Sequence, residues 1–154
     1  MPVFTGSGVI VSFTPNLPAD LLIATYQGLA GILEVGELQT SPGGGGKEYT
    51  EVPHDSLNNR ETQQLLGNFT RTPVTLTVGN DNDDSASNQE AFAALVGVSA
   101  GFSLRVQFSQ EAREHWCQCR MTAAGEPDVQ GANAVTTRAY TVRPFTDWTK
   151  GALV

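Results

Sequence analysis

Hydrophobic and polar residues alternate along several short segments of this chain, and a period of two predicts half-buried β-strands. In residues 74–78, valine and leucine alternate with threonine, and the β-branched residues among them suit a pleated sheet. In residues 101–109 (GFSLRVQFS), phenylalanine, leucine and valine would face a core while serine, arginine and glutamine face solvent. Further strands are predicted at 31–38, 47–52 and 115–121. A long strand is predicted at 132–145, whose apolar residues on both faces indicate that a helix or a neighbouring subunit covers it.

One segment has the period of a helix instead. Ser87 followed by Glu90 forms a capping box at its start. Phe92 and Leu95 belong to an apolar stripe, and Gly97 is placed to end the helix. Together these elements predict a mainly β, α+β fold, namely an antiparallel β-sandwich or half-barrel with one short flanking α-helix.

Other segments lack a regular period. Residues 1–19 are interrupted by Pro and Gly, so we expect an extended N-terminal arm with room for one short strand, followed by a single domain over residues 20–154. Residues 41–67 begin with a glycine run and continue with many polar residues, which predicts a long loop that carries binding. Pro73 cannot donate to a sheet, so a bend should precede the strand at 74–78.

The order of these features resembles a known family. A loop with His-Asp-Ser at 54–56 and Arg-Glu at 60–61 leads through a Gly-to-Pro run into a Val-Thr-Leu-Thr-Val strand. An acidic turn at 80–89, a short helix and two strands follow, and then a Gly-Glu-Pro-Asp turn and a long final strand. This order, over roughly residues 29–148, resembles the major tail proteins of long-tailed bacteriophages, which are tail tube proteins.

The resemblance implies a structural virion protein of the phage tail that is assembled in the cytoplasm of the bacterial host. Its copies would form hexameric rings that stack into a tube for genome delivery. Its other partners would be the tape-measure protein, the tail terminator and baseplate or tip proteins, with no cofactor and no membrane. We expect polar contacts between subunits from residues of the long loop: Pro53, His54, Asp55, Ser56, Arg60 and Glu61.

The charge of the chain fits a protein that DNA passes without binding. The formal net charge is −7, which argues against a protein that holds nucleic acid through its phosphates. Acidic walls would repel passing phosphates and would not trap them. The acids that we place first on a channel wall lie on the predicted strands beside the glycine run: Glu34, Glu37, Glu48 and Glu51.

Patterns for catalysis or metal binding are weak. The adjacent His-Asp-Ser of residues 54–56 does not make a triad, because triad residues are brought together by the fold. We therefore expect no enzyme. His115, Cys117 and Cys119 share one predicted strand face, from which side chains rarely converge on zinc. A calcium loop beginning at Asp81 lacks both the required glycine and the final glutamate.

The two cysteines are interpreted as reduced thiols. Cys117 and Cys119 are separated by one residue, and a bridge between them on a strand would be strained. Reduced thiols fit assembly in a cytosol. The first Lys or Arg is Lys47, so the positive start of a signal peptide is missing, and no apolar run approaches membrane-spanning length.

Two other interpretations stay open. The first is the tube of a contractile tail or of a type VI secretion-like device, which has a similar fold. The second, from another class, is a monomeric β-sandwich binding module. Such a module should gather exposed aromatic residues in one groove, whereas Trp116, Trp148 and the three tyrosines are scattered along the sequence.

Overall fold

The computed structural model describes residues 8–39, 46–54, 63–79, 88–126 and 137–153. Most of them lie in strands. The strands are β1 (Val9–Thr14), β2 (Leu33–Glu37), β3 (Lys47–His54), β4 (Gln63–Arg71), β5 (Val74–Gly79), β6 (Phe102–Phe108), β7 (Arg113–Ala124), β8 (Thr137–Pro144) and β9 (Thr149–Ala152). The short helices are α1 (Ile23–Gln27) and α2 (Asn88–Ala93).

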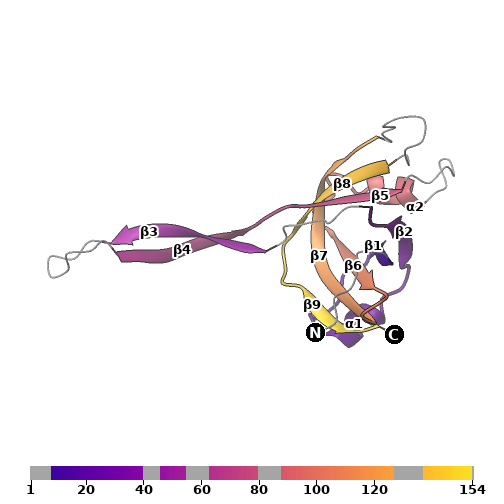
Figure 1. The fold of residues 1–154 in the computed structure, drawn as a ribbon, viewed down its shortest axis with the longest axis horizontal. Helices are drawn as coiled ribbons and strands as arrows, with labels where there is room; N and C mark the ends of the chain where they lie inside the picture. The colour runs from indigo at the N-terminus through magenta and orange to yellow at the C-terminus, as the bar shows by residue number, and fades with distance from the viewer. Residues whose placement is uncertain (1–7, 40–45, 55–62, 80–87, 127–136, 154) are drawn as a thin grey trace.

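Seven of the strands form one antiparallel sheet that curls into a half-barrel (Figure 1). The strand order is β2-β1-β6-β7-β8-β5, and β9 pairs with the first part of β7. The curl brings the two end strands together, where Leu38 forms an isolated bridge with Val78 and the Gln39 N–H donates to the Thr77 carbonyl at 2.8 Å. The predicted antiparallel half-barrel is therefore confirmed, and its meeting edges leave fewer unpaired backbone groups.

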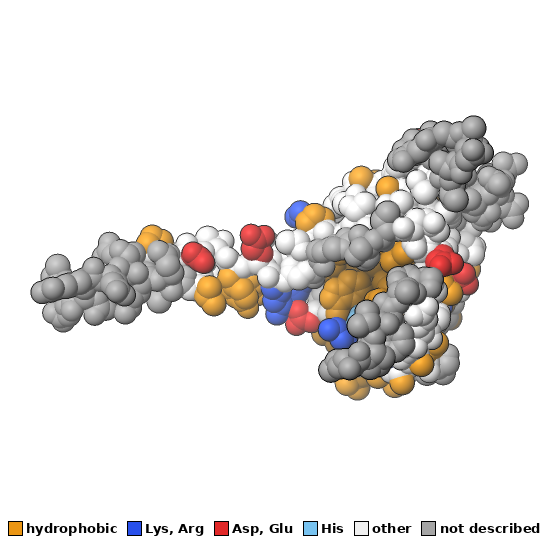
Figure 2. All heavy atoms as spheres, in the orientation of Figure 1, with side chains coloured by type: hydrophobic (Ala, Val, Ile, Leu, Met, Phe, Trp, Pro, Cys, Tyr) orange, Lys and Arg blue, Asp and Glu red, His pale blue; other side chains and the backbone are white. Residues whose placement is uncertain are grey.

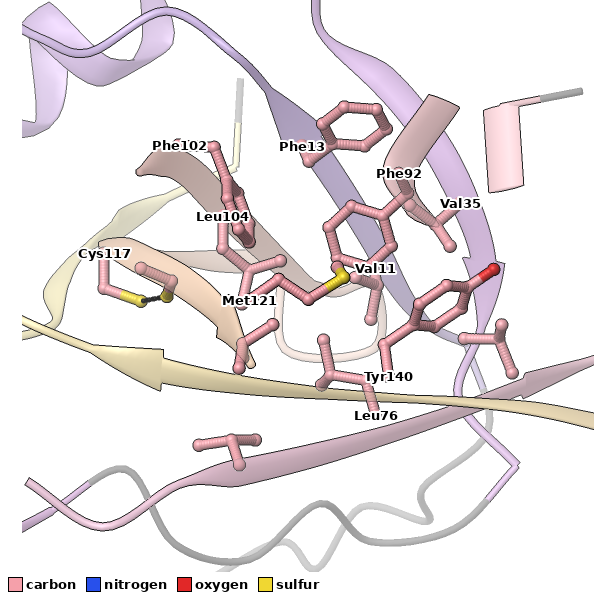
Figure 3. Close-up of a cluster of buried hydrophobic side chains, with 14 of the residues drawn as sticks. Val11, Phe13, Val35, Leu76, Phe92, Phe102, Leu104, Cys117, Met121 and Tyr140 are labelled. Carbon is pink, nitrogen blue, oxygen red and sulfur yellow. Dashed lines mark hydrogen bonds between the residues drawn. The ribbon is translucent and has the colours of Figure 1, made fainter. Parts of the chain in front are cut away.

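The concave side of the sheet holds the hydrophobic core (Figure 3). The Phe92 ring of α2 packs among three other rings, with centroids 4.8 Å from Phe13, 4.8 Å from Tyr140 and 5.4 Å from Phe102.

The alternation predicted for residues 74–78 is confirmed. In residues 101–109 the prediction is wrong for Ser103, which is fully buried because its hydroxyl donates to the Asn16 carbonyl, and Phe108 is only partly buried. Most apolar members of both segments are buried. The buried ones are Val74, Leu76, Val78, Phe102, Leu104 and Val106.

Helix α2 fastens the two end strands of the sheet to each other. The side-chain amide of Gln89 donates to the Val35 carbonyl on β2 at 3.1 Å and to the Gly79 carbonyl on β5 at 2.7 Å. The helix predicted for this segment is confirmed over Asn88–Ala93, and Ser87 of the predicted capping box lies outside the described residues. The helix ends at Ala93 and not at the predicted Gly97, which follows the helix with a φ of 78°, a left-handed conformation that glycine adopts readily.

The sequence predicted one helix, and the structure contains a second, α1. It covers the convex side of the sheet, where Tyr26 stacks on Trp116 with ring centroids 5.4 Å apart. Gln27 donates from Nε2 to the buried carboxylate of Glu114 at 2.7 Å. Residues 21–26 (LLIATY) gave no decisive period, because the face that Tyr26 buries is set by the distant strand β7 and not by its neighbours in sequence.

The expected N-terminal arm is corrected for residues 9–14. They form β1, which lies inside the sheet between β2 and β6. Val11 and Phe13 are buried in the core. Residues 1–7 of the expected arm lie outside the described residues. Local sequence could not place β1, because its partner β6 is far away along the chain.

The expected long loop over residues 41–67 is corrected as well. Most of its described part belongs to a β-hairpin, in which β3 pairs antiparallel with β4. The predicted strand at 47–52 is confirmed as part of β3 and extends to His54. Pro73 lies in the short connection between β4 and β5, outside both strands, as a residue that cannot donate to a sheet should.

Cys117 and Cys119 are free thiols in the concave core, with their sulfur atoms 3.0 Å apart. Burial raises the pKa of the Cys117 thiol, and its contact with Cys119 acts in the same direction. Within the described ranges, no three His, Cys, Asp or Glu side chains are grouped so that they could hold a metal ion. The helices of the described segments are all too short or too polar to cross a bilayer.

His115 makes the stability of the subunit depend on pH. Burial lowers the pKa of His115, the cations Lys150 and Arg113 lower it further, and Glu111 opposes them. The unfolded chain therefore binds the proton at a higher pH than the folded chain, so the free energy of unfolding falls as the pH drops below about 6.5. Between about pH 7.5 and about pH 5.5, the wild type should lose more melting temperature than His115→Gln. An equal loss in both proteins would contradict this prediction.

Candidate functional site

The β3–β4 hairpin projects from the half-barrel (Figure 1). It is a two-stranded sheet that pairs with no other described strand. An isolated two-stranded hairpin is at best marginally stable in water. The hairpin therefore depends on contacts at its base, or on contacts with another molecule.

The base of the hairpin is tied to the segment between β8 and β9. Lys47 Nζ and Arg71 Nη2 both contact Asp147 Oδ1, at 3.3 Å and 3.1 Å. The same two cations lie over the ring of Phe69, at 4.9 Å and 5.3 Å from its centroid. Tyr49 packs beside Phe69 with ring centroids 5.4 Å apart. Asp147 is well exposed, so each ion pair alone stabilises this anchor only weakly.

Apolar side chains on the hairpin remain open to solvent (Figure 2). The exposed fractions are 43% for Tyr49, 46% for Val52, 71% for Leu66 and 45% for Phe69. Single exposed apolar residues are common on protein surfaces. By register, Tyr49, Phe69 and Leu66 share one side of the hairpin and Val52 lies on the other, so the hairpin exposes apolar groups of the kind that mark an interaction site.

A second group of exposed leucines comes just before α1 in the chain, and α1 lies far from strands β3 and β4 (Figure 1). It contains Leu17, Leu21 and Leu22. The Thr149 hydroxyl on β9 donates to the Leu21 carbonyl at 2.9 Å, which holds this segment against the sheet. A chain with separate apolar surfaces can join further copies head to tail.

Two of the six predicted inter-subunit residues fall at the end of β3. Pro53 is exposed near the end of β3, and the backbone of His54 pairs with Gln63 of β4. The other four, Asp55, Ser56, Arg60 and Glu61, lie outside the described residues. Sequence reasoning predicted polar contact residues on this hairpin and did not identify its exposed apolar side chains.

The four predicted channel acids separate into two pairs. All four are exposed. Glu34 and Glu37 lie on β2, where a bulge lets them face Ser12 and Ile10 of β1. Opposite residues share one side of a sheet, so this bulge places both carboxylates on the same side. The other pair, Glu48 and Glu51, lies on β3 of the hairpin.

A hollow of about 330 Å³ opens where the hairpin meets the half-barrel, and sequence reasoning did not predict it. Its lining combines aromatic rings with guanidinium groups from separate strands. The lining residues are Phe69, Thr70, Arg71, Arg143, Pro144 and Phe145. No local motif in the sequence could have shown that β4 and β8 bring these groups together.

A scan against protein-family models gives no match, and neither does a search of curated proteins. Solved structures share the fold along nearly the whole chain. A chain of the anti-feeding prophage baseplate, solved by cryo-EM and 6-fold symmetrised, has a TM-score of 0.66 and 13% identity, over 99% of this chain and 97% of that one. A chain of the sheath/tube terminator of PVC, an extracellular contractile injection system, has a TM-score of 0.65 and 11% identity, over 99% and 98%.

A chain of a native gene transfer agent virion is also similar, with a TM-score of 0.58 and 10% identity, over 97% of this chain and 100% of that chain. Chains with a similar fold over nearly their whole length thus occur in several assembled particles. At such low identities the likeness shows the fold alone.

Proposed function

We propose that this chain is a structural subunit of a tail or injection tube, and that its copies form sixfold rings that stack into that tube. The observation that carries the proposal is the hairpin, which exposes apolar side chains on a fold shared end to end with subunits of such particles. One of these particles was solved with 6-fold symmetry, which supports the proposed ring size.

The hairpin gives the proposal a physical route to assembly. Its strands have backbone edges that no described strand pairs, and such edges accept strands of a neighbouring subunit. The apolar groups on the hairpin and beside α1 lie at different places, so the contact between copies is head to tail. A head-to-tail contact closes into a ring when its rotation permits.

The tube could belong to a long-tailed phage or to a contractile device. Two of the similar solved structures come from an extracellular contractile injection system, which favours a tube of the contractile type. A tube of either type would also contact a tape-measure protein, a terminator and a baseplate. Binding of a sheath protein to the assembled tube would separate the two cases.

The proposed channel wall carries Glu34 and Glu37, which share one side of β2. Carboxylates on the wall would repel the phosphates of passing DNA and leave no attractive site. We propose no catalytic role for the chain. The pair on the hairpin, Glu48 and Glu51, is better placed for a contact between subunits.

The purified wild-type protein should form rings or tubes as its concentration rises. Self-association is expected because each copy carries both apolar surfaces of the head-to-tail contact. Light scattering would follow the mass of the particles, and negative-stain electron microscopy would show their shape. A strict monomer at every concentration, with no rings or tubes on the grid, would overturn the proposed function.

A further inference from the structure

The hollow at the base of the hairpin carries positive charge that the described chain balances only in part. Arg71 and Arg143 line it, and Lys47 lies nearby over Phe69. The salt bridges of this group within the described segments all end on one carboxylate, that of Asp147. In a chain with a net charge of −7, such a basic hollow is unusual and points to an anionic ligand.

Arg71 gives the first reason to expect a carboxylate there. Its Nη2 donates to Asp147 at 3.1 Å, whereas its Nε and Nη1 atoms are buried without a hydrogen-bond partner. Because these two nitrogens are buried, a carboxylate from outside reaches them only when the Arg71 side chain turns toward the hollow. Such a turn would relieve the cost of two buried N–H groups without acceptors. The planar guanidinium of arginine matches the two oxygens of a carboxylate.

Arg143 gives a second and independent reason. In the register of β7 and β8 it lies directly opposite Arg120, and like charges in that position destabilise a sheet. Arg120 is held by its own contacts, because its Nε donates to the Ser99 carbonyl and its guanidinium lies 4.3 Å from the centroid of the Phe145 ring. An anion bound beside Arg143 would reduce this repulsion.

The apolar part of the lining narrows the choice of ligand. Phe69, Pro144 and Phe145 stand beside the two arginines, so the hollow suits a carboxylate next to an apolar group. The hairpin presents such a pair, because Glu51 on β3 lies directly opposite Leu66 on β4. Both side chains are exposed, and opposite residues project from the same side of a sheet.

We propose that the hollow receives Glu51 and Leu66 from the hairpin of a second copy of this chain. The Glu51 carboxylate pairs with Arg71 and Arg143, and Leu66 packs on the aromatic rim. This inference rests on the proposed function, because it describes one contact within the proposed rings or between them. The contact is head to tail, since the base of one hairpin holds the outer part of the next.

Charge exchange tests the pairing. Arg143→Glu and Glu51→Arg should each raise the concentration needed for assembly at least about tenfold, as expected when one partner of a charged hydrogen bond is lost. The double variant Arg143→Glu/Glu51→Arg should recover most of the loss. Arg143 is used because Arg71 also anchors the hairpin within its own subunit. Sedimentation velocity over a dilution series would measure the concentration needed.

Two controls distinguish loss of the contact from misfolding and from the effect of a changed net charge. Arg143→Glu removes the repulsion with Arg120, so the melting temperature of the free subunit should not fall. Glu111→Arg changes the net charge as much as Glu51→Arg but lies in the turn between β6 and β7, and it should leave assembly unchanged.

The outcomes separate this inference from the proposed function. If the wild type never assembles, the proposed function fails, and this inference fails with it. If the wild type assembles and Arg143→Glu assembles equally well, the inference alone is overturned. It is also overturned if the double variant recovers nothing, or if a short DNA duplex binds the wild type and not Arg143→Glu, since phosphate would then be the ligand.

Discussion

Replacing both Val52 and Leu66 with serine is expected to abolish tube assembly and to leave the subunit folded. The two side chains are 46% and 71% exposed, so the folded subunit gains little from them. Burial of each in a contact between copies would contribute about 1.5–3 kcal/mol. The loss of both should raise the concentration needed for assembly more than about a hundredfold.

The measurement compares assembly and melting of the same proteins. Tubes are counted by electron microscopy, and the melting temperature is followed by circular dichroism. Val98→Ser is the matched control, because Val98 is 39% exposed but lies on the half-barrel and not on the hairpin. If the double variant forms normal tubes, the apolar side chains of the hairpin do not take part in the contact between copies. A large fall in its melting temperature would show that these residues serve the fold.

The half-barrel could be predicted from the sequence where one strand face meets the core. Strand β5 alternates cleanly, since its apolar side chains pack inside the subunit. Strand β6 alternates less cleanly because its convex side is covered too, with Ser103 fully buried and Arg105 partly buried over the Trp116 ring. Strand β7 is less regular because both of its faces are covered in part, with Cys117 in the concave core and Trp116 under α1. The place of β1 in the sheet could not be predicted, because pairing with β6 is a long-range choice.

The candidate site was predictable only as a region. Residues 41–67 were interpreted as a loop because they begin with a glycine run and continue with many polar and few apolar positions. Their pattern makes sense once Leu66 and Val52 are seen as exposed side chains on a projecting hairpin. The hollow could not be predicted from local sequence, since Arg71 and Arg143 come from strands far apart in the chain. The proposed role of these arginines in binding a carboxylate depends on where the fold places them.

The largest effect on stability is expected from Phe92→Ala. Phe92 is fully buried, and its ring packs against Phe13, Phe102 and Tyr140. Removing a buried phenylalanine costs about 3–5 kcal/mol, partly for lost burial and partly for the cavity that remains. For a domain of this size the melting temperature should fall by about 2–4 °C for each kcal/mol. Since whole domains are stable by only about 5–15 kcal/mol, this one change removes a large part of the total.

Urea denaturation would measure this loss as a lower midpoint with an unchanged slope. Val96→Ala is the control just after α2, because Val96 is 43% exposed and should cost less than about 1 kcal/mol. A loss that small for Phe92→Ala would mean that the ring is not central to the core. Assembly should also weaken in Phe92→Ala, because Gln89 on the same helix holds the end strands β2 and β5 together. That defect comes with a lower melting temperature, whereas the defect of the hairpin variant does not, so the two measurements together separate a failure of folding from a failure of contact.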